Sequence, residues 1–229
     1  MKIGILTAMT SEYEQLAALL ENGAECTVGK FKYLIGRLGK NEIVLRQCGI
    51  GKVNAAVGTA ELIRSFEPSC IISTGVAGGI DKQLDVMDVV VSSSIVHHDV
   101  WCGMGCECGQ VQGMPTMFNA DKVLYETALG IDTENATRIH GGLICTGDQF
   151  ITSRTELDRI KSKFPAGLAV DMESAAIAQT CHIYNVPFVS FRIISDTPGV
   201  DKHIQQYENF WGEMANRSFG ITRKYLLAL

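Results

Sequence analysis

The chain has 229 residues, of which 46% are hydrophobic and 20% are charged, and this composition excludes a disordered chain. Its formal net charge of −5 argues against a nucleic-acid-binding protein, because such proteins usually carry a basic excess. No apolar run approaches the roughly 18 residues that a membrane-spanning helix needs. We therefore expect a folded globular protein without a nucleic-acid or membrane partner.

Prolines and glycines punctuate the whole chain instead of gathering at one boundary, which predicts a single domain over residues 1–229. The first residues carry one basic side chain and then about seven apolar ones, so we expect a buried first strand there and not a signal peptide. The eight cysteines are then expected to be reduced thiols in a cytoplasmic protein. Five of them are dispersed, mostly in apolar runs: Cys26, Cys48, Cys70, Cys145 and Cys181.

Apolar runs of strand length alternate with segments of helical pattern along the chain. In chain order, we predict a strand at 2–9 and then a helix, which a capping box opens at Ser11 and which Gly23 ends. Strands at 31–37 and 42–47 form a hairpin, and a helix at 52–66 and strands at 70–74 and 86–96 follow. The remaining elements are a helix at 119–130, a strand at 141–146, a helix at 153–164, a strand at 167–171, a helix at 173–185, a strand at 187–195 and a last helix from about 204 to 227. This alternation predicts an α/β fold, a three-layer α/β/α sandwich whose mixed central sheet is largely parallel and covered on both faces.

Three carboxylates follow predicted strands, at the end of the sheet where ligands bind in such folds. Glu12 lies in the first turn after the first strand, Glu173 opens a helix, and Asp196 precedes the turn Thr197–Gly199. Each has an ordinary structural interpretation, because a helix dipole favours an acidic first turn and Asp is common before turns. Three such residues at one rim are better explained by a functional site.

The glycine-rich segments give weaker signals. Gly75–Gly79 follows a predicted strand, and its small residues would let a ligand approach the backbone closely. Neither this segment nor Gly49–Lys52 has the spacing of a phosphate-binding loop. No serine lies in a G-x-S-x-G motif, so an α/β-hydrolase is not expected.

Six segments together resemble a known family. They are AMTSE (8–12), CGIGKVNAA (48–56), ISTGVAGGI (72–80), GDQFI (147–151), AVDMESAAIAQ (169–179) and FRIISDTPG (191–199). In this order and spacing they resemble the bacterial 5′-methylthioadenosine/S-adenosylhomocysteine nucleosidases, which belong to the nucleoside phosphorylase superfamily. The resemblance implies the nucleoside phosphorylase-like fold and cleavage of the N-glycosidic bond of both nucleosides by water.

The resemblance also implies roles for the three carboxylates. Asp196 would protonate the leaving adenine, for which its pKa must be raised. Glu12 would be the base for the attacking water, and we expect the N-terminus of its helix to keep it ionised. Glu173 would bind the ribose hydroxyls and stabilise the oxocarbenium-like sugar.

Further residues match substrate-binding positions of the family. Phe150 would stack on adenine and the Ile151 backbone would read the edge of the base, although from the residues alone we would favour a core aromatic at Phe150. Met172 would line the sugar, while Arg192 and Ser195 would orient the water and Asp196. The remaining matched positions, several of them in an apolar pocket for the 5′-alkylthio group, are Ala8, Met9, Ile50, Val76, Ala77, Gly78 and Tyr207.

The resemblance implies no cofactor and no metal, and a homodimer in which a loop of one subunit completes the other's pocket. That loop, 101–109, departs from the family pattern, with Met104 near the place of an aromatic residue and Gln112 near that of a proline. Cys102, Cys106 and Cys108, with the two histidines at 97–98, could also form a metal site, but their spacing is not a standard zinc pattern. We favour a variable interface loop.

Three alternatives stay open. A purine nucleoside phosphorylase would need phosphate as the attacking group. A non-catalytic nucleoside-binding protein would keep the fold, yet it would have no need for an acid and a base together. A hydrolase of another 5′-modified adenosine, such as a futalosine derivative, would differ mainly in the apolar 5′ pocket.

Overall fold

The computed structural model describes residues 1–133, 137–197, 203–211 and 215–229. Its strands form one ten-stranded sheet. In chain order the strands are β1 Lys2–Thr7, β2 Glu21–Val28, β3 Phe31–Leu38, β4 Asn41–Gln47, β5 Cys70–Gly79, β6 Val89–His97, β7 Phe118–Asn119, β8 Ile139–Thr146, β9 Gly167–Asp171 and β10 Phe188–Asp196. The helices are α1 Thr10–Ala17, α2 Lys52–Phe66, α3 Lys122–Leu129, α4 Arg154–Lys163, α5 Ser174–Tyr184, α6 His203–Asn209 and α7 Ala215–Ala228.

The strand order in the sheet is β10-β6-β8-β9-β5-β1-β4-β3-β2, and β7 pairs with β6. A further pairing of β10 with β5 closes five strands, β10, β6, β8, β9 and β5, into a ring. The described strands make five parallel and five antiparallel pairings, so the predicted mixed sheet is confirmed. Its centre is parallel, because β10, β5, β1 and β4 pair in parallel one after another. The antiparallel pairings are those of the hairpin β2–β3–β4 and those of β10 with β6, β5 with β9 and β6 with β7.

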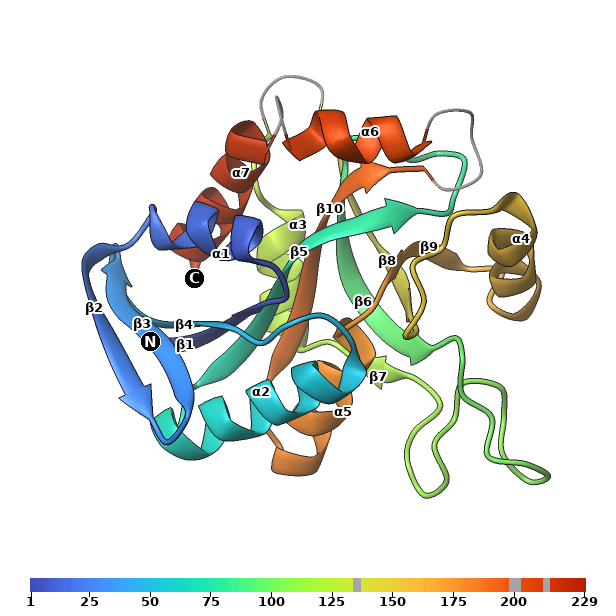
Figure 1. The fold of residues 1–229 in the computed structure, drawn as a ribbon, viewed down its shortest axis with the longest axis horizontal. Coiled ribbons are helices and arrows are strands. Elements are labelled where there is room, and N and C mark those ends of the chain that lie inside the picture. The colour runs from blue at the N-terminus through green and yellow to red at the C-terminus, as the bar shows by residue number, and fades with distance from the viewer. Residues whose placement is uncertain (134–136, 198–202, 212–214) are drawn as a thin grey trace.

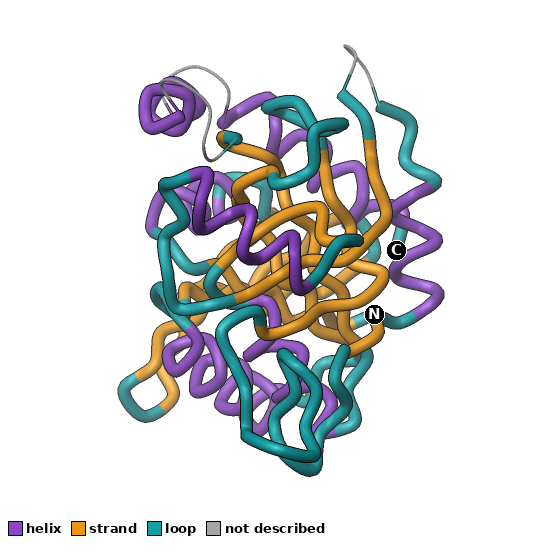
Figure 2. Tube along the Cα trace, turned by 90° about the vertical axis from the view of Figure 1, so that its right-hand side faces the viewer, coloured by secondary structure: helices purple, strands orange, loops and turns teal. Residues whose placement is uncertain are grey.

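Neighbouring residues of a strand point to opposite faces, and they divide the core accordingly. Ile71 of β5 packs in a cluster with residues of α2 and α5, whereas Ile72 packs in a second cluster with residues of α1, α3 and α7. Figure 1 shows α2 and α5 side by side below the sheet, with α1 and α7 on the other side. A third cluster lies under α4, at the end of the sheet that the ring forms. Figure 2 shows the loop segments that project from this body.

The first helix differs from its prediction. It begins at Thr10 with Met9 as N-cap, so Ser11 lies inside the helix and does not cap it. The reciprocal partner in this capping arrangement is Glu12, whose carboxylate accepts the Met9 N–H at 3.0 Å. The helix ends at Ala17, and Gly23, expected just after its end, lies in β2. β2 was not predicted because its side chains are nearly all exposed and show no apolar alternation.

Two other predictions need correction. The strand predicted at 70–74 continues through the glycine-rich run to Gly79, because β10 and β9 pair with that run. The single helix predicted at about 204–227 is two helices, α6 and α7. Residues 198–199 of the predicted turn after Asp196 lie outside the described residues. The remaining elements fall within a few residues of their predicted ends.

Candidate active site

One pocket lies at the rim where the carboxyl ends of β1, β5, β9 and β10 meet, as expected for an α/β sheet. Its open volume is about 680 Å³, which includes the space at its mouth and is in the range of small-molecule sites. The residues that line it are Ala8, Met9, Glu12, Ile50, Val76, Ala77, Gly78, Gln149, Phe150, Ile151, Val170, Asp171, Met172, Glu173, Ser195, Asp196 and Tyr207. All three predicted carboxylates are therefore in one pocket, and each is buried.

The Glu12 carboxylate is held by the backbone on both sides of the pocket. One oxygen accepts the N–H groups of Ala8 and Met9 at 2.9 and 3.0 Å, and the other accepts the N–H of Val76 at 3.0 Å. Burial nevertheless raises the pKa of Glu12 above its usual value, against the opposing effects of Arg192 and of these hydrogen bonds. Loss of solvent therefore affects this carboxyl more than the N–H donors do, which the position of Glu12 in a first helical turn does not predict. A raised pKa makes the carboxylate a stronger base.

Gly75 is small because charged groups occupy the space of its missing side chain. A Cβ atom built there would collide with Oε1 of Glu12 and lie 2.7 Å from Nη1 of Arg192. The sequence predicted that the small residues here admit a ligand. At Gly75 the structure shows that they admit the carboxylate and the guanidinium instead.

Arg192 lies behind the pocket wall and is 1% exposed. Its Nε is 2.9 Å from the Asp171 carboxylate, and both side chains of this ion pair are buried. Its Nη2 donates to Ser73 Oγ at 2.8 Å and to Ser174 Oγ at 3.1 Å. Arg192 was predicted among the substrate-binding residues, but it does not line the pocket of the described structure.

Glu173 is the N-cap residue of α5, and its carboxylate reaches across the pocket mouth to the start of α2. It accepts the N–H of Gly51 at 2.9 Å, where the backbone has a φ of 93° that favours glycine. Burial raises the pKa of Glu173 to about 7, and the carboxylates of Asp171 and Glu12 add to the effect while Arg192 opposes it. A carboxyl with such a pKa changes charge easily near neutral pH.

Asp196 ends β10 at a bulge in the pairing with β5, where the register shifts between Ile194 and Asp196. Such a bulge re-aims side chains at the end of a strand. The neighbouring Ser195 donates its hydroxyl to Asp196 Oδ1 at 2.7 Å, which fixes the orientation of the carboxyl group. Both side chains are buried and line the pocket.

The opposite side of the pocket is apolar. Phe150 is 55% exposed, and its ring meets the ring of Tyr207 edge to face at 5.8 Å. The Tyr207 hydroxyl donates to the sulfur of Met9 at 3.5 Å, and Ile50 lies exposed at the mouth. A half-exposed aromatic at a pocket mouth is not a core residue, so the structural interpretation of Phe150 is wrong. The arrangement suits a ligand with a flat face and an apolar substituent.

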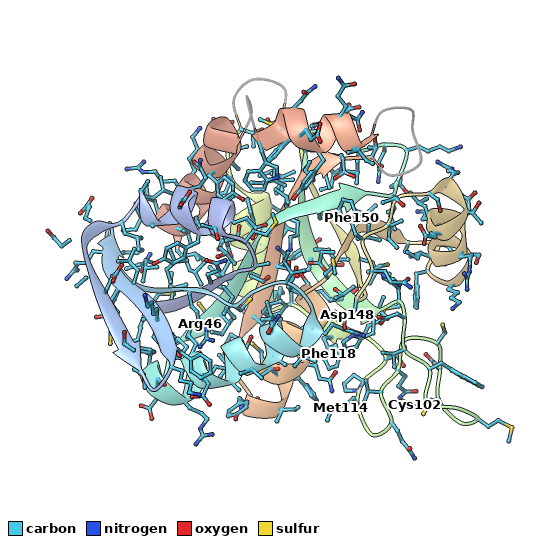
Figure 3. The ribbon with its side chains drawn as sticks, viewed as in Figure 1. Arg46, Cys102, Met114, Phe118, Asp148 and Phe150 are labelled. Atoms are coloured by element: carbon cyan, nitrogen blue, oxygen red, sulfur yellow. The ribbon has the colours of Figure 1, made fainter. Side chains whose placement is uncertain are left out.

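The segment that carries Phe150 is tied to the start of α2. The Lys52 N–H donates to Asp148 Oδ1 at 2.7 Å, and the Lys52 ammonium lies 2.7 Å from Asp99 Oδ1. Asp99 in turn accepts the N–H of Asp148 at 2.9 Å. Figure 3 shows Phe150 and Asp148 in the right-hand half of the view, above the projecting loop that carries Cys102. This clamp holds Phe150 next to the carboxylate side of the pocket.

Three pocket residues were not predicted as site residues: Gln149, Val170 and Asp171. Gln149 and Asp171 adjoin predicted site residues, so proximity in the sequence was the available signal. Met104 is 99% exposed and does not line the described pocket of this chain. Its expected place is in a partner's pocket, so its role stays a prediction.

The cysteine-rich loop shows no metal-binding arrangement. Within the described residues, no group of three or more His, Cys, Asp and Glu side chains is placed to hold a metal ion. Cys102 is exposed, and Cys108 packs against the cluster under α4. His97 is buried and contacts Gln179 of α5 at 3.0 Å. No helix in the described parts of the chain is long and apolar enough to span a membrane.

The comparisons with known proteins agree on one family. The family model of the phosphorylase superfamily matches residues 2–227. A 5′-methylthioadenosine/S-adenosylhomocysteine nucleosidase of Desulfotalea psychrophila is 42% identical over 222 residues, which are 96% of this chain and 95% of the relative. The crystal structure of such a nucleosidase from Neisseria meningitidis, in complex with methylthio-immucillin-A, matches with a TM-score of 0.91 at 37% identity and covers 100% of this chain and 99% of that one.

A futalosine hydrolase mutant of Helicobacter pylori also matches, with a TM-score of 0.91 at 27% identity over 100% of this chain and 99% of that chain. Its lower identity is consistent with a more distant relationship than that of the nucleosidases. The resemblance predicted from the six sequence segments is confirmed. The chain belongs to the phosphorylase superfamily and, within it, to the family of 5′-methylthioadenosine/S-adenosylhomocysteine nucleosidases.

Proposed function

We propose that this protein is a hydrolase that cleaves the N-glycosidic bond of 5′-methylthioadenosine and S-adenosylhomocysteine, releasing adenine and the 5′-thio-substituted ribose. The observation that carries the proposal is the meeting of Glu12, Glu173 and Asp196, all buried, in one pocket opposite an exposed aromatic ring. Membership of the nucleosidase family supports the same reaction. A protein that only binds nucleosides has no need of three buried carboxylates, whose desolvation is costly.

The carboxylates divide the reaction between them. Asp196, held by Ser195, gives its proton to N7 of adenine as the bond from nitrogen to C1′ breaks. Glu173 binds the 2′- and 3′-hydroxyls, and its negative form stabilises the oxocarbenium-like sugar. Glu12 takes a proton from the water whose oxygen bonds to C1′. The products are neutral adenine and a free sugar, and the proton on Glu12 returns to the acid through solvent.

The other side of the pocket binds the base and the 5′ substituent. Phe150 stacks on adenine while the Ile151 backbone reads its edge, and Met172 contacts the sugar. The 5′-alkylthio group lies against Met9, Ile50 and Val76 beneath Tyr207, where apolar surface and the Met9 sulfur suit a thioether. The backbone around Ala8, Ala77 and Gly78 completes the wall.

Water is favoured over phosphate as the attacking group. None of the described residues that line the pocket is Lys or Arg, whereas a phosphate needs cationic or N–H donors. Arg46 of β4 does not line the pocket, and it stacks over Phe31 at 4.1 Å and donates to the Tyr33 hydroxyl at 2.9 Å. The one buried guanidinium behind the pocket, that of Arg192, is already paired.

The fold and assembly are part of the proposal. Helices on both faces of the sheet support a three-layer α/β/α arrangement in a single domain over residues 1–229. The exposed side chain of Ile50 at the pocket mouth supports a homodimer in which the partner, through its Met104 loop, covers the 5′ substituent. The cytoplasmic location inferred from the eight thiols stays a prediction.

The first test is adenine release from 5′-methylthioadenosine in phosphate-free buffer and again with phosphate. We expect adenine and free sugar in both buffers. Activity only with phosphate, yielding a sugar 1-phosphate, would identify a phosphorylase. Turnover of a futalosine derivative in preference to both thio-nucleosides would instead identify a futalosine hydrolase, the activity named for the Helicobacter pylori structure.

Two variants test the assigned roles. Asp196→Asn is expected to lose nearly all turnover and still bind nucleoside, because the amide is too weak an acid to protonate the leaving adenine. Glu12→Gln is expected to lose the water step and still bind transition-state mimics. Wild-type rates in either variant would mean that another group supplies the acid or the base.

A further inference from the structure

The environment of Arg192 contains a carboxylate that the proposed mechanism does not use. Asp171, the last residue of β9, lies 2.9 Å from Nε of Arg192, and neither side chain is more than 1% exposed. With Nη2 donating to Ser73 and Ser174, only the Nη1 side of the guanidinium is left to face Gly75 and Glu12. The orientation of Arg192 is therefore set by the groups that contact its Nε and Nη2 atoms.

Asp171 is itself fixed by several donors. Thr146 donates its hydroxyl to Oδ1 at 2.5 Å, and the backbone N–H of Ser174 donates to the same oxygen at 3.3 Å. The Ser174 hydroxyl contacts Oδ2 and also lies 2.7 Å from the hydroxyl of Ser190. Thr146 and Asp171 are register partners in the parallel pairing of β8 with β9. The carboxylate is therefore held by two strands and the first turn of α5.

We propose that Asp171 is a positioning residue of the nucleosidase reaction: it holds Arg192 by its Nε edge and keeps the guanidinium from pairing closely with Glu12 and Glu173. The inference rests on the proposed function and deepens it. A buried guanidinium requires a partner, because an unpaired buried charge is strongly unfavourable. If Asp171 did not supply that partner, the nearest remaining carboxylates would be the ribose-binding residue and the base.

The charges around Arg192 support this division. The groups that act on it electrostatically are Asp171 at the end of β9, Glu173 before α5, Glu12 on α1 and the thiol of Cys48 after β4. The Asp171 charge also raises the pKa of Glu173. Three carboxylates thus act on one cation, and Arg192 forms its ion pair with Asp171, the one of the three to which the proposed reaction gives no role. Glu12 and Glu173 keep the raised pKa values that a base and a switchable anion use.

The test compares pH profiles of adenine release by the wild-type protein, Asp171→Asn and Asp171→Glu. In Asp171→Asn we expect Arg192 to pair with Glu12 or Glu173, which lowers their pKa. The acidic limb of kcat/KM should move to lower pH by about one unit, and kcat at pH 7 should fall about tenfold, since a weaker base transfers the proton more slowly. Asp171→Glu keeps the charge and is expected to restore both the limb and kcat to within about threefold.

Two readouts separate this role from a structural one. Adenine affinity, measured by calorimetry, should stay within about twofold in Asp171→Asn, because adenine is proposed to contact Phe150, Ile151 and Asp196 and not the pair of Arg192 with Asp171. Ser174→Ala removes a contact of both Arg192 and Asp171 without changing charge, so kcat should fall at least about threefold with the acidic limb unchanged. This small substitution also serves if Asp171→Asn does not fold.

The outcomes are distinct. A folded Asp171→Asn with the wild-type limb and kcat overturns the inference, as does wild-type kcat in Ser174→Ala where the first variant cannot be purified. A wild-type protein that releases no adenine from either thio-nucleoside refutes the proposed function instead, before any variant is compared.

Discussion

The buried Glu173 makes the stability of this protein depend on pH in a defined direction. Burial raises its pKa from 4.5 to about 7, so the native state holds this proton more tightly than the unfolded chain does. Between these two pH values folding takes up a proton, and the free energy of unfolding falls as pH rises. At 1.36 kcal/mol per pKa unit, the deprotonation of Glu173 lowers the free energy of unfolding by at most about 3 kcal/mol at pH 8.

Glu173→Gln removes this cost, because the amide is neutral at every pH and its oxygen can still accept the Gly51 N–H. We expect the variant to be more stable than the wild type by up to about 3 kcal/mol at pH 8, with a much smaller difference at pH 4.5. Urea unfolding at both pH values measures the change. The matched control is Glu14→Gln, an exposed glutamate on α1.

The test is whether the stability difference between Glu173→Gln and the wild type grows from pH 4.5 to pH 8. A Glu173→Gln variant whose stability difference from wild type is the same at both pH values, or is less favourable at pH 8, would refute the argument that desolvation dominates at this carboxyl. Activity is not the readout, since the substitution also removes the proposed ribose contact.

Further predictions concern the pocket and the core. Gly75→Ala should lower kcat at least about tenfold in a steady-state assay, because the new methyl group displaces Glu12 or Arg192; an unchanged kcat would show that both side chains yield without cost. Phe150→Ala should raise KM by roughly 10- to 100-fold with a smaller effect on kcat, the expected loss for one aromatic–base stack of about 1–3 kcal/mol; an unchanged KM would remove Phe150 from the base site. Asp99→Asn weakens the clamp on Asp148 and should raise KM more than it lowers kcat, whereas equal changes would point to a wider disturbance. Tyr225→Phe removes a buried hydrogen bond to Leu124 of 3.1 Å and should cost about 1 kcal/mol in urea unfolding with activity retained.

The sequence indicated the three carboxylates because each directly follows an apolar strand, and the strand ends of an α/β sheet meet at one rim. It could not indicate the ion pair of Arg192 with Asp171. That contact depends on the register of β8 with β9 and on the pairing of β10 with β5, and periodicity says nothing about either. The raised pKa of Glu12 could not be predicted for a similar reason, since its burial comes from segments remote in the sequence.

Local patterns failed in two other places. β2 has exposed side chains on both faces, so it lacks the alternation by which a half-buried strand is recognised. The run Gly75–Gly79 has the composition of a loop but forms the end of a central strand, because its neighbours need the space that side chains would fill. In both cases tertiary contacts outweighed local preference.

The position of β2 has a consequence for association between copies of the sheet. With β10 closed onto β5, the long free edge among the described strands is that of β2. An unpaired edge can recruit a strand from another molecule and start aggregation. Here the register shift between Glu21 and Ala24, the left-handed backbone of Asn22 and the charge of Glu25 interrupt that edge. The irregular and charged edge of β2 thus disfavours the growth of the folded protein into a continuous intermolecular sheet.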